Sequence, residues 1–356
     1  MEIKKTNRAN AYRMLQCLAV AIRPLSVAEL AELLAFEFDA AKGGIPKLNM
    51  DWRWEDHEKT VLSICSSLVT VVPAGYGSRV VQFSHFSVKE FLMSDRLAMS
   101  TRDISQYHIV LEDANTVLSQ ASLGVLLRDP VDQNIADSVS LALYAGRNRV
   151  THAQAEKVAP HIRDGMRHLF DPNKPYFSAW VQLYDVDCGF APDELQNKRQ
   201  PQAAPLYYAA LCGFNEIVTV LAAETPQYAS AIGGGGGTAL HAASLQGHVQ
   251  VVRSLLQCGV DVDIRGQWDQ TPLHFASQWG HVSVNAVQYL LDNGADVNAQ
   301  DKDHTTPISL AVMYGHLDAV KVLLDHHADV NCQDLTAGPH CTMHYAMIFP
   351  KAISPR

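Results

Sequence analysis

Hydrophobic positions in the last third of the chain recur at a nearly fixed interval. The phrase TPLH at 271–274 is preceded 33 residues earlier by TALH at 238–241 and followed 35 residues later by TPIS at 306–309. After each copy come a Gly-His pair, a Leu-Leu pair and a phrase close to Gly-Ala-Asp-Val-Asn. This pattern predicts two short helices per copy, with apolar faces that only a neighbouring copy can cover.

Each position in the repeated unit has a physical role. Thr271 can cap the first helix, and Pro272 suits its first turn, where no amide donor is needed. We expect Gly280 to permit a left-handed turn between the two helices and Gly294 to end the second helix in a left-handed cap. His327 stands in the same cap position in the next copy, at a cost of about 1 kcal/mol relative to glycine.

These phrases, at these offsets, resemble the ankyrin repeat. The resemblance implies a stack of helix pairs, an α-solenoid, with β-hairpin fingers between the pairs. The third repeat carries two extra residues near Asn285 and Ala286. We expect four repeats, starting at Ala204 and then spanning 238–270, 271–305 and 306–340, with a truncated fifth at 341–347 that Pro350 interrupts.

The first hundred residues have the pattern of a winged helix. Apolar positions at helical spacing predict a helix over 9–21, Ser26 and Glu29 form a capping box for a second, and a third is expected over 57–68. Two β-rich runs, 68–72 and 79–86, are joined by PAGYGS, which is a hairpin signal. One further helix over VKEFLMSDRL (88–97) closes the unit.

Helical patterns continue between this domain and the repeats. We expect helices over 105–127, 137–145 and 153–169, and then the aromatic stretch FDPNKPYFSAWVQLYD (170–185), whose rings should anchor the repeats. The predicted fold is therefore mainly α: a winged-helix domain at 1–100, a helical connector at 101–203 and the ankyrin solenoid at 204–356.

Three phrases, CSSLVTVV (65–72), VVQFSHFSVKEFL (80–92) and LFDPNKPYFSAWVQLYD (169–185), resemble fungal NACHT–ankyrin proteins, relatives of the NOD-like receptors. In that family the winged helix and connector follow a nucleotide-binding module, which this sequence lacks. It has no GxxxxGK[ST] phosphate loop, and no lysine follows the glycine run 233–237. His85 matches the family's nucleotide-contacting histidine, but we interpret it as structural.

Composition indicates an ordinary globular protein, since 47% of residues are hydrophobic and 18% charged. Seven cysteines without a CxxC pair indicate reduced thiols inside a cell. We expect neither a signal peptide nor a membrane span, and a location in the cytoplasm or nucleus.

The charge distribution argues against nucleic-acid binding. The net charge is −9, and residues 204–356, with six basic and 13 acidic side chains, contribute −7 of it. Such a surface repels a phosphate backbone. The third predicted helix, HEKTVLSICSSL, is mostly apolar with one lysine, so we expect no direct reading of DNA.

Catalytic and metal chemistry find little support in the sequence. The tightest potential metal cluster is His340, Cys341 and His344, but His344 occupies the same repeat position as His241 and His274, where the imidazole bonds to backbone. No GxSxG or HExxH motif is present. We expect no enzyme activity, no metal and no cofactor.

A binding surface for a protein partner is the positive signal. In each repeat we expect exposure at the position after the TPLH histidine and at the two positions before the glycine, and bulky side chains there are typical of interface centres. The alternative is half-buried packing between repeats. These positions are Tyr208, Leu211, Cys212, Ala242, Leu245, Gln246, Phe275, Gln278, Trp279, Leu310, Met313 and Tyr314.

The expected anchors are Trp268, Phe275, Trp279, Met313 and Tyr314, together with Tyr208 and Leu245. Trp268 belongs to this set as the tip of a finger. Because Asp263, Asp269, Asp301 and Asp303 surround the anchors, the partner should be apolar with a basic rim.

Two functions remain open. One is a non-enzymatic scaffold or adaptor that binds a protein in the repeat groove. The alternative is a regulatory signalling fragment that acts on NACHT proteins, or a co-regulator that acts on transcription factors.

Overall fold

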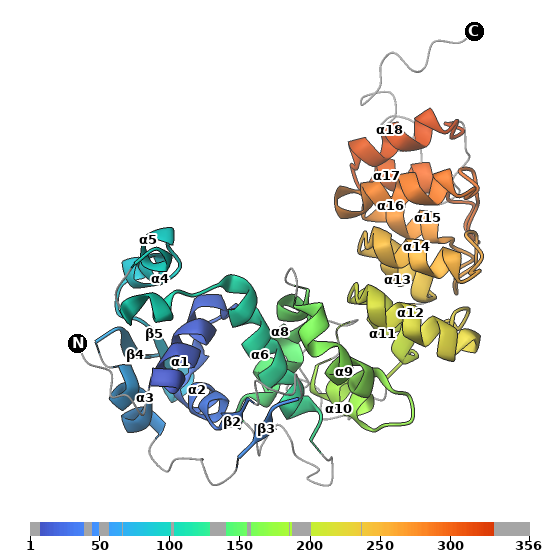
Figure 1. Ribbon diagram of the computed structural model, residues 1–356. Coiled ribbons are helices and arrows are strands. Elements are labelled where there is room, and N and C mark those ends of the chain that lie inside the picture. Colours follow the sequence, from blue (N-terminus) through green and yellow to red (C-terminus); the bar gives the residue numbers. More distant parts are fainter. Residues whose placement is uncertain are drawn as a thin grey trace. The chain divides into compact units, whose positions relative to one another are not determined.

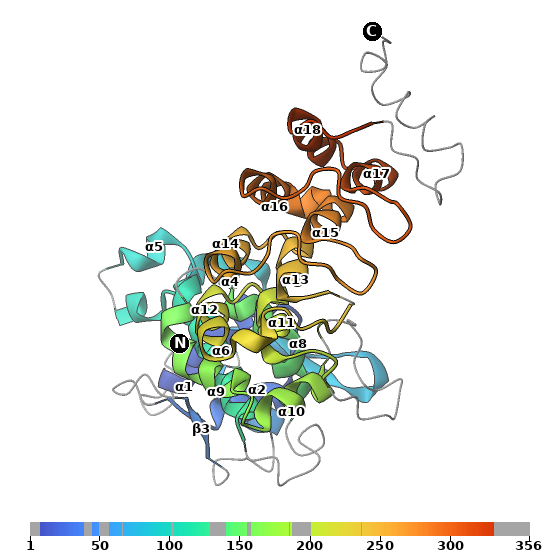
Figure 2. The same ribbon diagram turned by 90° about the vertical axis from the view of Figure 1, so that its right-hand side faces the viewer.

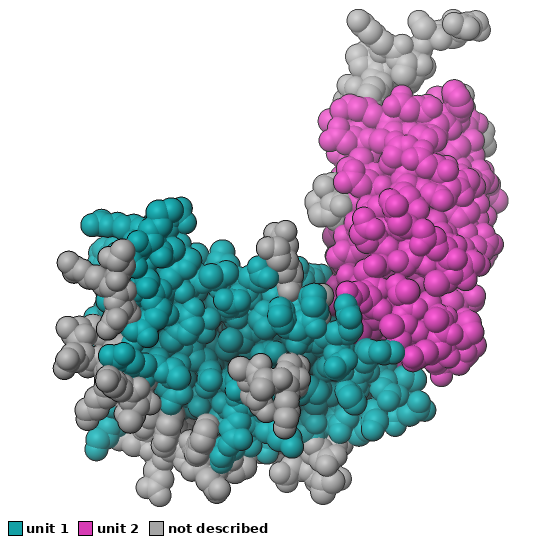
Figure 3. Space-filling model, viewed as in Figure 1, with its two compact units in different colours: residues 1–200 teal, residues 201–356 magenta. Residues whose placement is uncertain are grey.

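The computed structural model describes residues 8–38, 45–49, 57–65, 67–100, 103–128, 140–154, 158–184, 186, 201–235 and 237–330. The chain divides into two compact units, residues 1–200 and 201–356 (Figures 1 and 3). Both are mainly helical, as predicted. Residues 331–356, which include the end of the fourth repeat, the truncated fifth and the His340–His344 cluster, lie outside the described residues.

The first unit begins with the expected winged helix. Strand β1 adds to β5, so the sheet has the antiparallel order β1-β5-β4, with Val71 opposite Val81. A small sheet, β2-β3, was not predicted. The elements are α1 (Arg8–Val20), β1 (Leu25–Ser26), α2 (Val27–Leu34), β2 (Phe36–Glu37), β3 (Lys47–Leu48), α3 (His57–Cys65), β4 (Val69–Pro73), the 3-10 turn η3 (Gly75–Gly77) and β5 (Arg79–Phe83).

The single helix predicted over 88–97 is wrong. Two short helices, α4 (Phe86–Leu92) and α5 (Asp95–Ala98), stand there, and Ser94 is the N-cap residue of the second. The Ser94 hydroxyl donates to the carbonyl oxygen of Phe91 at 2.7 Å. Such side-chain bonds compete with continued helix and favour a break.

The connector helices also differ from the predicted bounds. The segment expected to be one helix from residue 105 starts as a 3-10 turn. Pro160 stands in the first turn of α9 and fixes where α9 begins. The elements are η4 (Asp103–Tyr107), α6 (Leu111–Leu126), α8 (Ala142–Ala153), α9 (Ala159–Phe170) and α10 (Tyr176–Leu183).

The aromatic stretch packs within the connector itself. The Phe170, Phe177 and Trp180 rings have centroids 5.6–6.1 Å apart, and the Trp180 indole N–H donates to the carbonyl of Gly146 in α8 at 3.1 Å. These rings therefore join α8, α9 and α10 to one another.

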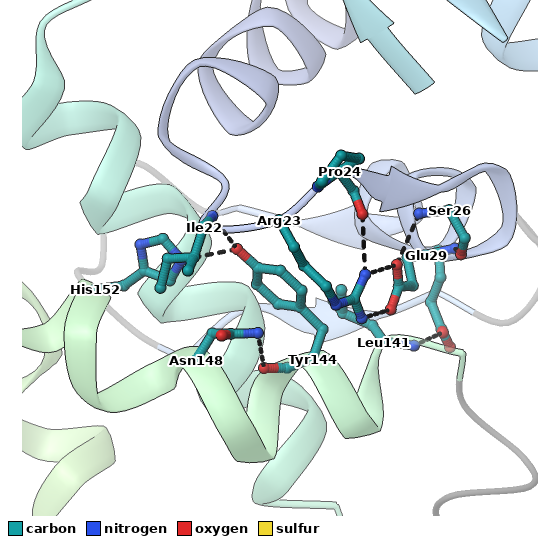
Figure 4. A network of polar contacts seen from close by, with 10 residues as sticks. Ile22, Arg23, Pro24, Ser26, Glu29, Leu141, Tyr144, Asn148 and His152 are labelled. Atoms are coloured by element: carbon teal, nitrogen blue, oxygen red, sulfur yellow. Dashed lines mark hydrogen bonds and ion pairs between the residues drawn. The ribbon is translucent and has the colours of Figure 1, made fainter. Parts of the chain in front are cut away.

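A polar network joins the winged helix to the connector (Figure 4). The Arg23 guanidinium donates to both carboxylate oxygens of Glu29, at 2.9 and 2.5 Å, and lies 5.0 Å from the centroid of the Tyr144 ring. The Tyr144 hydroxyl accepts from the Ile22 N–H at 3.2 Å and lies 2.9 Å from Nε2 of His152. The Tyr144 ring of the connector and the Arg23 guanidinium of the winged helix thus hold these two parts of the unit together.

Two ionisable groups of this network, Tyr144 and His152, are neutral near pH 7. Burial raises the pKa of Tyr144 to about 12 and lowers the pKa of His152 to about 4. Beside them, the Leu141 N–H donates to Glu32 Oε2 at 2.9 Å, which ties the start of α8 to α2. The winged helix and the connector are therefore joined through buried hydrogen bonds.

The second unit is a stack of helix pairs. The first helices of the pairs pack on one another in one row and the second helices form a parallel row (Figure 2). The pairs are α11 (Pro205–Leu211) with α12 (Asn215–Glu224), α13 (Ala239–Leu245) with α14 (Val249–Gln257), α15 (Pro272–Gln278) with α16 (Gly280–Asp292), and α17 (Pro307–Met313) with α18 (Leu317–Asp325); the 3-10 turn η6 (Pro226–Tyr228) follows α12.

The TPLH histidines bond to backbone, as predicted. His241 Nδ1 accepts from the Thr238 N–H at 3.1 Å, and its Nε2 lies 2.9 Å from the carbonyl oxygen of Gln270 in the next finger. His274 repeats this arrangement with Thr271 at 3.1 Å and Thr305 at 3.0 Å. Each imidazole therefore links its own helix cap to the following finger.

The fingers close as tight turns. Gly266 N–H donates to Gln270 O at 2.8 Å, and Asp301 N–H donates to Thr305 O at 3.0 Å. Within the described residues, the predicted hairpins carry no strand, and only Gly233 and Gly237 form an isolated bridge.

The left-handed turn predicted at Gly280 is wrong. Gly247 and Gly315 have φ of 70° and 75°, whereas α16 begins at Gly280 itself. The two extra residues of this repeat and a start two residues earlier, at the glycine itself, lengthen α16 to 13 residues, against nine in α14 and α18. Gly280 is instead needed for close packing, since a Cβ there would lie 2.7 Å from that of Ala319.

The left-handed caps are confirmed. Gly259 and Gly294 have φ of 84° and 88°, and His327 adopts 64° in the same position. Because left-handed backbone is unfavourable for a residue with a Cβ, the fourth repeat carries local strain at this cap.

We predict that His327→Gly stabilises the protein by up to about 1 kcal/mol, because glycine relieves the left-handed strain at an exposed position. Urea unfolding of the full chain measures the change. The reciprocal variant Gly294→His, where no atom would obstruct the new Cβ, should destabilise by a similar amount. A destabilising His327→Gly would show that the imidazole makes a contact worth more than the strain.

We predict that stability falls as the pH drops below about 6.5, the ordinary pKa of histidine. Burial lowers the pKa of His241 to about 4 and also lowers that of His274. The unfolded chain thus binds more protons than the folded chain in this window, which removes up to about 1.4 kcal/mol per pH unit for each histidine.

The control is the double variant His241→Ser and His274→Ser, since Ser309 naturally occupies this position in the fourth repeat. It should be less stable near neutral pH, but its unfolding midpoint should depend less steeply on pH between about 6.5 and 4.5. Parallel curves for the two proteins would contradict the assignment.

Candidate protein-binding surface of the repeats

Exposed bulky side chains gather where the first helices of the repeats end. Trp279, Met313 and Tyr314 are 45%, 49% and 51% exposed, and each stands at the last position of α15 or α17 or directly after it. Leu317, at the start of α18, is 46% exposed. We call Leu245, Gln278, Trp279, Met313, Tyr314 and Leu317 the helix-end surface.

The backbone beneath this surface is already bonded. The carbonyl oxygens of Leu211 and Gln278 accept from Nε2 of His248 at 3.2 Å and of His316 at 2.8 Å. In the lengthened third repeat, the single proton of the Ser283 hydroxyl is shared between the carbonyl oxygens of Leu245 and Trp279, each at 3.0 Å. Helix carbonyls that would otherwise need water are thus satisfied by the following repeat.

Side chains of adjacent repeats also contact each other across the surface. The Gln278 amide donates to the Tyr314 hydroxyl at 3.2 Å, and the Tyr314 ring lies nearly parallel to that of His316, at 12° and 6.4 Å. Tyr314 is therefore held in place before any partner arrives, which lowers the entropy lost on binding.

Trp268 belongs to a second group, at the fingers. Its indole is 47% exposed, and Nζ of Lys302 in the next finger lies 3.3 Å from the ring centroid. Arg265 donates to the carbonyls of Asp269 and Gln300 at 2.6 and 2.7 Å, which joins the same two fingers. We call Arg265, Trp268, Asp269, Lys302 and Asp303 the finger surface. Asp301, which was expected to face the partner as well, is buried, and its carboxylate accepts from the N–H groups of Asp303 and Thr305 at 2.9 Å each.

The two surfaces lie at opposite ends of α15. Trp268 precedes its first residue and Trp279 follows its last, and a seven-residue helix is about 10 Å long. The acidic side chains expected to surround the anchors belong to the fingers. No member of the helix-end surface is charged, and the nearby Asp318 carboxylate pairs with Lys321 at 2.7 Å.

Several positions expected at the surface are buried. Tyr208 is fully buried, in a helix whose seven residues are all buried, so its expected exposure is wrong. Leu211, Cys212, Ala242 and Leu310 are buried as well.

Phe275 and Leu245 are half-buried. The Phe275 ring meets His241 of the preceding repeat edge-on, with centroids 4.9 Å apart, so it contributes to packing between repeats. A partner-binding role for Trp268, Trp279, Met313, Tyr314, Phe275 and Leu245 stays a prediction.

The sequence interpretation missed three features. Leu317 could have been found, because an apolar residue directly after a Gly-His pair starts the second helix at its exposed end. The bonds of His248 and His316 to the preceding helix were signalled by the recurrence of the Gly-His pair itself. The cation–π contact of Lys302 had no sequence signal.

Elsewhere the described residues offer little reactive chemistry. Within them, no group of three His, Cys, Asp or Glu side chains is arranged to hold a metal ion. His85 caps α4 by accepting from the Ser87 N–H at 3.2 Å, and burial raises the pKa of the Cys17 thiol to about 12. In the same parts of the chain, no helix combines the length and apolarity needed to cross a bilayer.

Family comparisons agree with this architecture. A model of ankyrin repeats in three copies matches residues 178–266 and 258–334, and a model described as the winged helix domain of GPI inositol-deacylase matches residues 1–102.

Relatives add a distant fungal homologue. The "Azaphilone pigments biosynthesis cluster protein L" of Monascus ruber is 29% identical over 272 residues, which are 70% of this chain and 55% of that protein. "Protein phosphatase 1 regulatory subunit 12A" of Mus musculus and of Rattus norvegicus is 49% identical over 45 residues, 13% of this chain and 4% of those proteins. The chain thus spans about half of the fungal relative and a small part of the mammalian ones. It is an N-terminal winged-helix domain followed by ankyrin repeats.

Proposed function

We propose that the chain is a non-enzymatic scaffold whose repeats bind a protein partner through the helix-end surface. The observation that carries this proposal is the exposure of Trp279, Met313 and Tyr314 on adjacent repeats. Large apolar side chains that are exposed to water in the free protein are typical of residues that a partner covers. Ankyrin repeats suggest protein–protein interaction in general. The binding of a particular partner at the helix-end surface is our proposal.

The finger surface indicates a second property of the partner, the charge at the rim of its binding surface. The exposed carboxylates of Asp269 and Asp303 favour basic side chains at the rim of the partner surface. Such charges speed association at low salt more than they strengthen the final complex. Cys17, Cys212 and Cys258 are free thiols. They fit our proposal that the protein acts in the cytoplasm or nucleus.

A regulatory role is the second candidate. The winged helix that precedes the repeats favours this regulatory role. The Arg23–Glu29–Tyr144 network holds that winged helix to the connector. As a fragment of NACHT type, the chain would act on NACHT proteins. As a co-regulator, it would act on transcription factors.

We predict that Trp279→Ala weakens partner binding by about 2 kcal/mol or more, because the indole is an exposed anchor at the centre of the surface. Stability should change by less than about 1 kcal/mol, as for other surface substitutions. Affinity capture from lysate of the native cells, quantified by mass spectrometry for wild type and variant, identifies partners that depend on Trp279. Titration with the purified partner then gives the loss of affinity.

Trp268→Ala is the matched control, since it removes an equally exposed indole from the fingers. The classes of captured protein separate the candidates, because NACHT proteins and transcription factors are distinct. A large fall in the unfolding midpoint of Trp279→Ala with unchanged capture would mean that the ring is core, and the surface assignment would be abandoned.

We also predict that the protein does not bind ATP or ADP, because the sequence has no lysine-containing phosphate loop. Isothermal titration calorimetry with Mg²⁺ and either nucleotide should show no saturable heat. Binding with a dissociation constant of about 1 to 10 μM, which corresponds to about −7 to −8 kcal/mol, would contradict the proposal of a non-enzymatic scaffold without a nucleotide site.

A further inference from the structure

We infer that the occupant of the helix-end surface is an amphipathic α-helix of the partner, laid along the stack with one apolar residue per repeat at intervals of seven. This inference rests on the proposed function and adds the structural class of the ligand. It follows from three properties of the surface: its repeat distance, its saturated backbone and its lack of charge.

The repeat distance matches two turns of a helix. The helices α13, α15 and α17 pack side by side, and packed helices have axes 8–10 Å apart. Seven residues of an α-helix rise about 10.5 Å. Leu245, Trp279 and the Met313–Tyr314 pair, one group per repeat, therefore stand in register with positions i, i+7 and i+14 of a helix along the stack.

An extended peptide would match the same distance with every third residue, because a strand rises about 3.3 Å per residue. The backbone decides between the two. A ligand that adds as a strand bonds its own N–H and C=O groups to the receptor, as at a sheet edge. At the ends of the first helices, the carbonyls of Leu211 and Gln278 already accept from His248 and His316. The N–H groups of Gln246 and Tyr314 donate within the stack to the carbonyls of Ala242 and Leu310, so these two backbone donors are not left for a strand.

A helix has no such requirement, because its backbone groups are bonded internally and it presents side chains alone. The helix-end surface likewise presents side chains alone: Trp279, Met313, Tyr314 and Leu317, all near half-exposed. The repeat surface and a helical ligand would therefore contact each other through side chains alone.

Charge defines the faces of this helix. The face on the helix-end surface should be apolar with neutral polar residues, because no member of that surface is charged. The flank towards the fingers should carry Lys or Arg, because the exposed Asp269 and Asp303 lie beyond the opposite end of α15 and its neighbours.

The test is selection from two phage-displayed peptide libraries against the purified full chain. In the first, 18-residue helical peptides carry fixed Glu–Lys pairs on the outer face and random residues at i, i+3, i+4, i+7, i+11 and i+14. In the second, 12-residue peptides carry random residues at alternate positions between β-branched residues, which favours extended structure. We expect enrichment from the helical library, with apolar residues at intervals of seven.

Selected peptides are then synthesised and titrated by fluorescence anisotropy. Trp279→Ala should lower their affinity about 10-fold or more, as expected for a central anchor. Trp268→Ala should change it less than about twofold, since rim charges and distant side chains contribute little. A central proline in the peptide should abolish binding because it breaks the helix.

Enrichment from the extended library alone, from neither library, or of helical peptides that are insensitive to Trp279→Ala would overturn the inference. The proposed function fails differently. If capture of native partners depends on Trp279 while helical peptides do not bind, the scaffold function stands and only the helical ligand is wrong. If capture is independent of Trp279, the proposed function itself is wrong.

Discussion

The fingers of the second and third repeats depend on the hydrogen bond that each TPLH histidine makes to the finger after it. His241 and His274 each accept from the cap of their own helix and lie within 3.0 Å of a carbonyl at the end of that finger, directly before the cap residue of the next repeat. Because both rings are buried, losing either partner would leave a polar group unsatisfied, at about 1 to 3 kcal/mol. In the second and third repeats the neutral ring thus fixes the finger to its own first helix, and the following cap residue, Thr271 or Thr306, continues directly from the bonded carbonyl.

The second helices are held by a similar device at the other end. His248 and His316 donate to the last carbonyls of the preceding first helix, and in the third repeat the Ser283 hydroxyl lies 3.0 Å from the carbonyl of Leu245. The two extra residues of that repeat are accommodated in a longer α16. The stack keeps its bonds while the sequence pattern changes.

Pattern alone was enough to predict the repeats and the winged helix, because both are set by local signals. The TPLH phrase, the Ser26–Glu29 capping box and the strands around PAGYGS each specify one element. Exposure was predicted less well, since Tyr208 and Phe275 hold equivalent positions and differ in burial. Burial depends on what neighbouring elements cover, and no period in the sequence records that. The Arg23–Tyr144 contact joins residues 121 positions apart and had no local signal either.

The same bonds that stabilise the stack determine how it can recognise a partner. Because helix carbonyls such as those of Leu211 and Gln278 already accept within the stack, we propose that recognition falls to the side chains at the helix ends. Trp279 and Tyr314 are about half exposed, and the proposal therefore requires that such positions can differ between repeats with little effect on stability. On this proposal, histidines and glycines in the repeated positions maintain the stack, and the few positions that the repeat leaves free determine specificity.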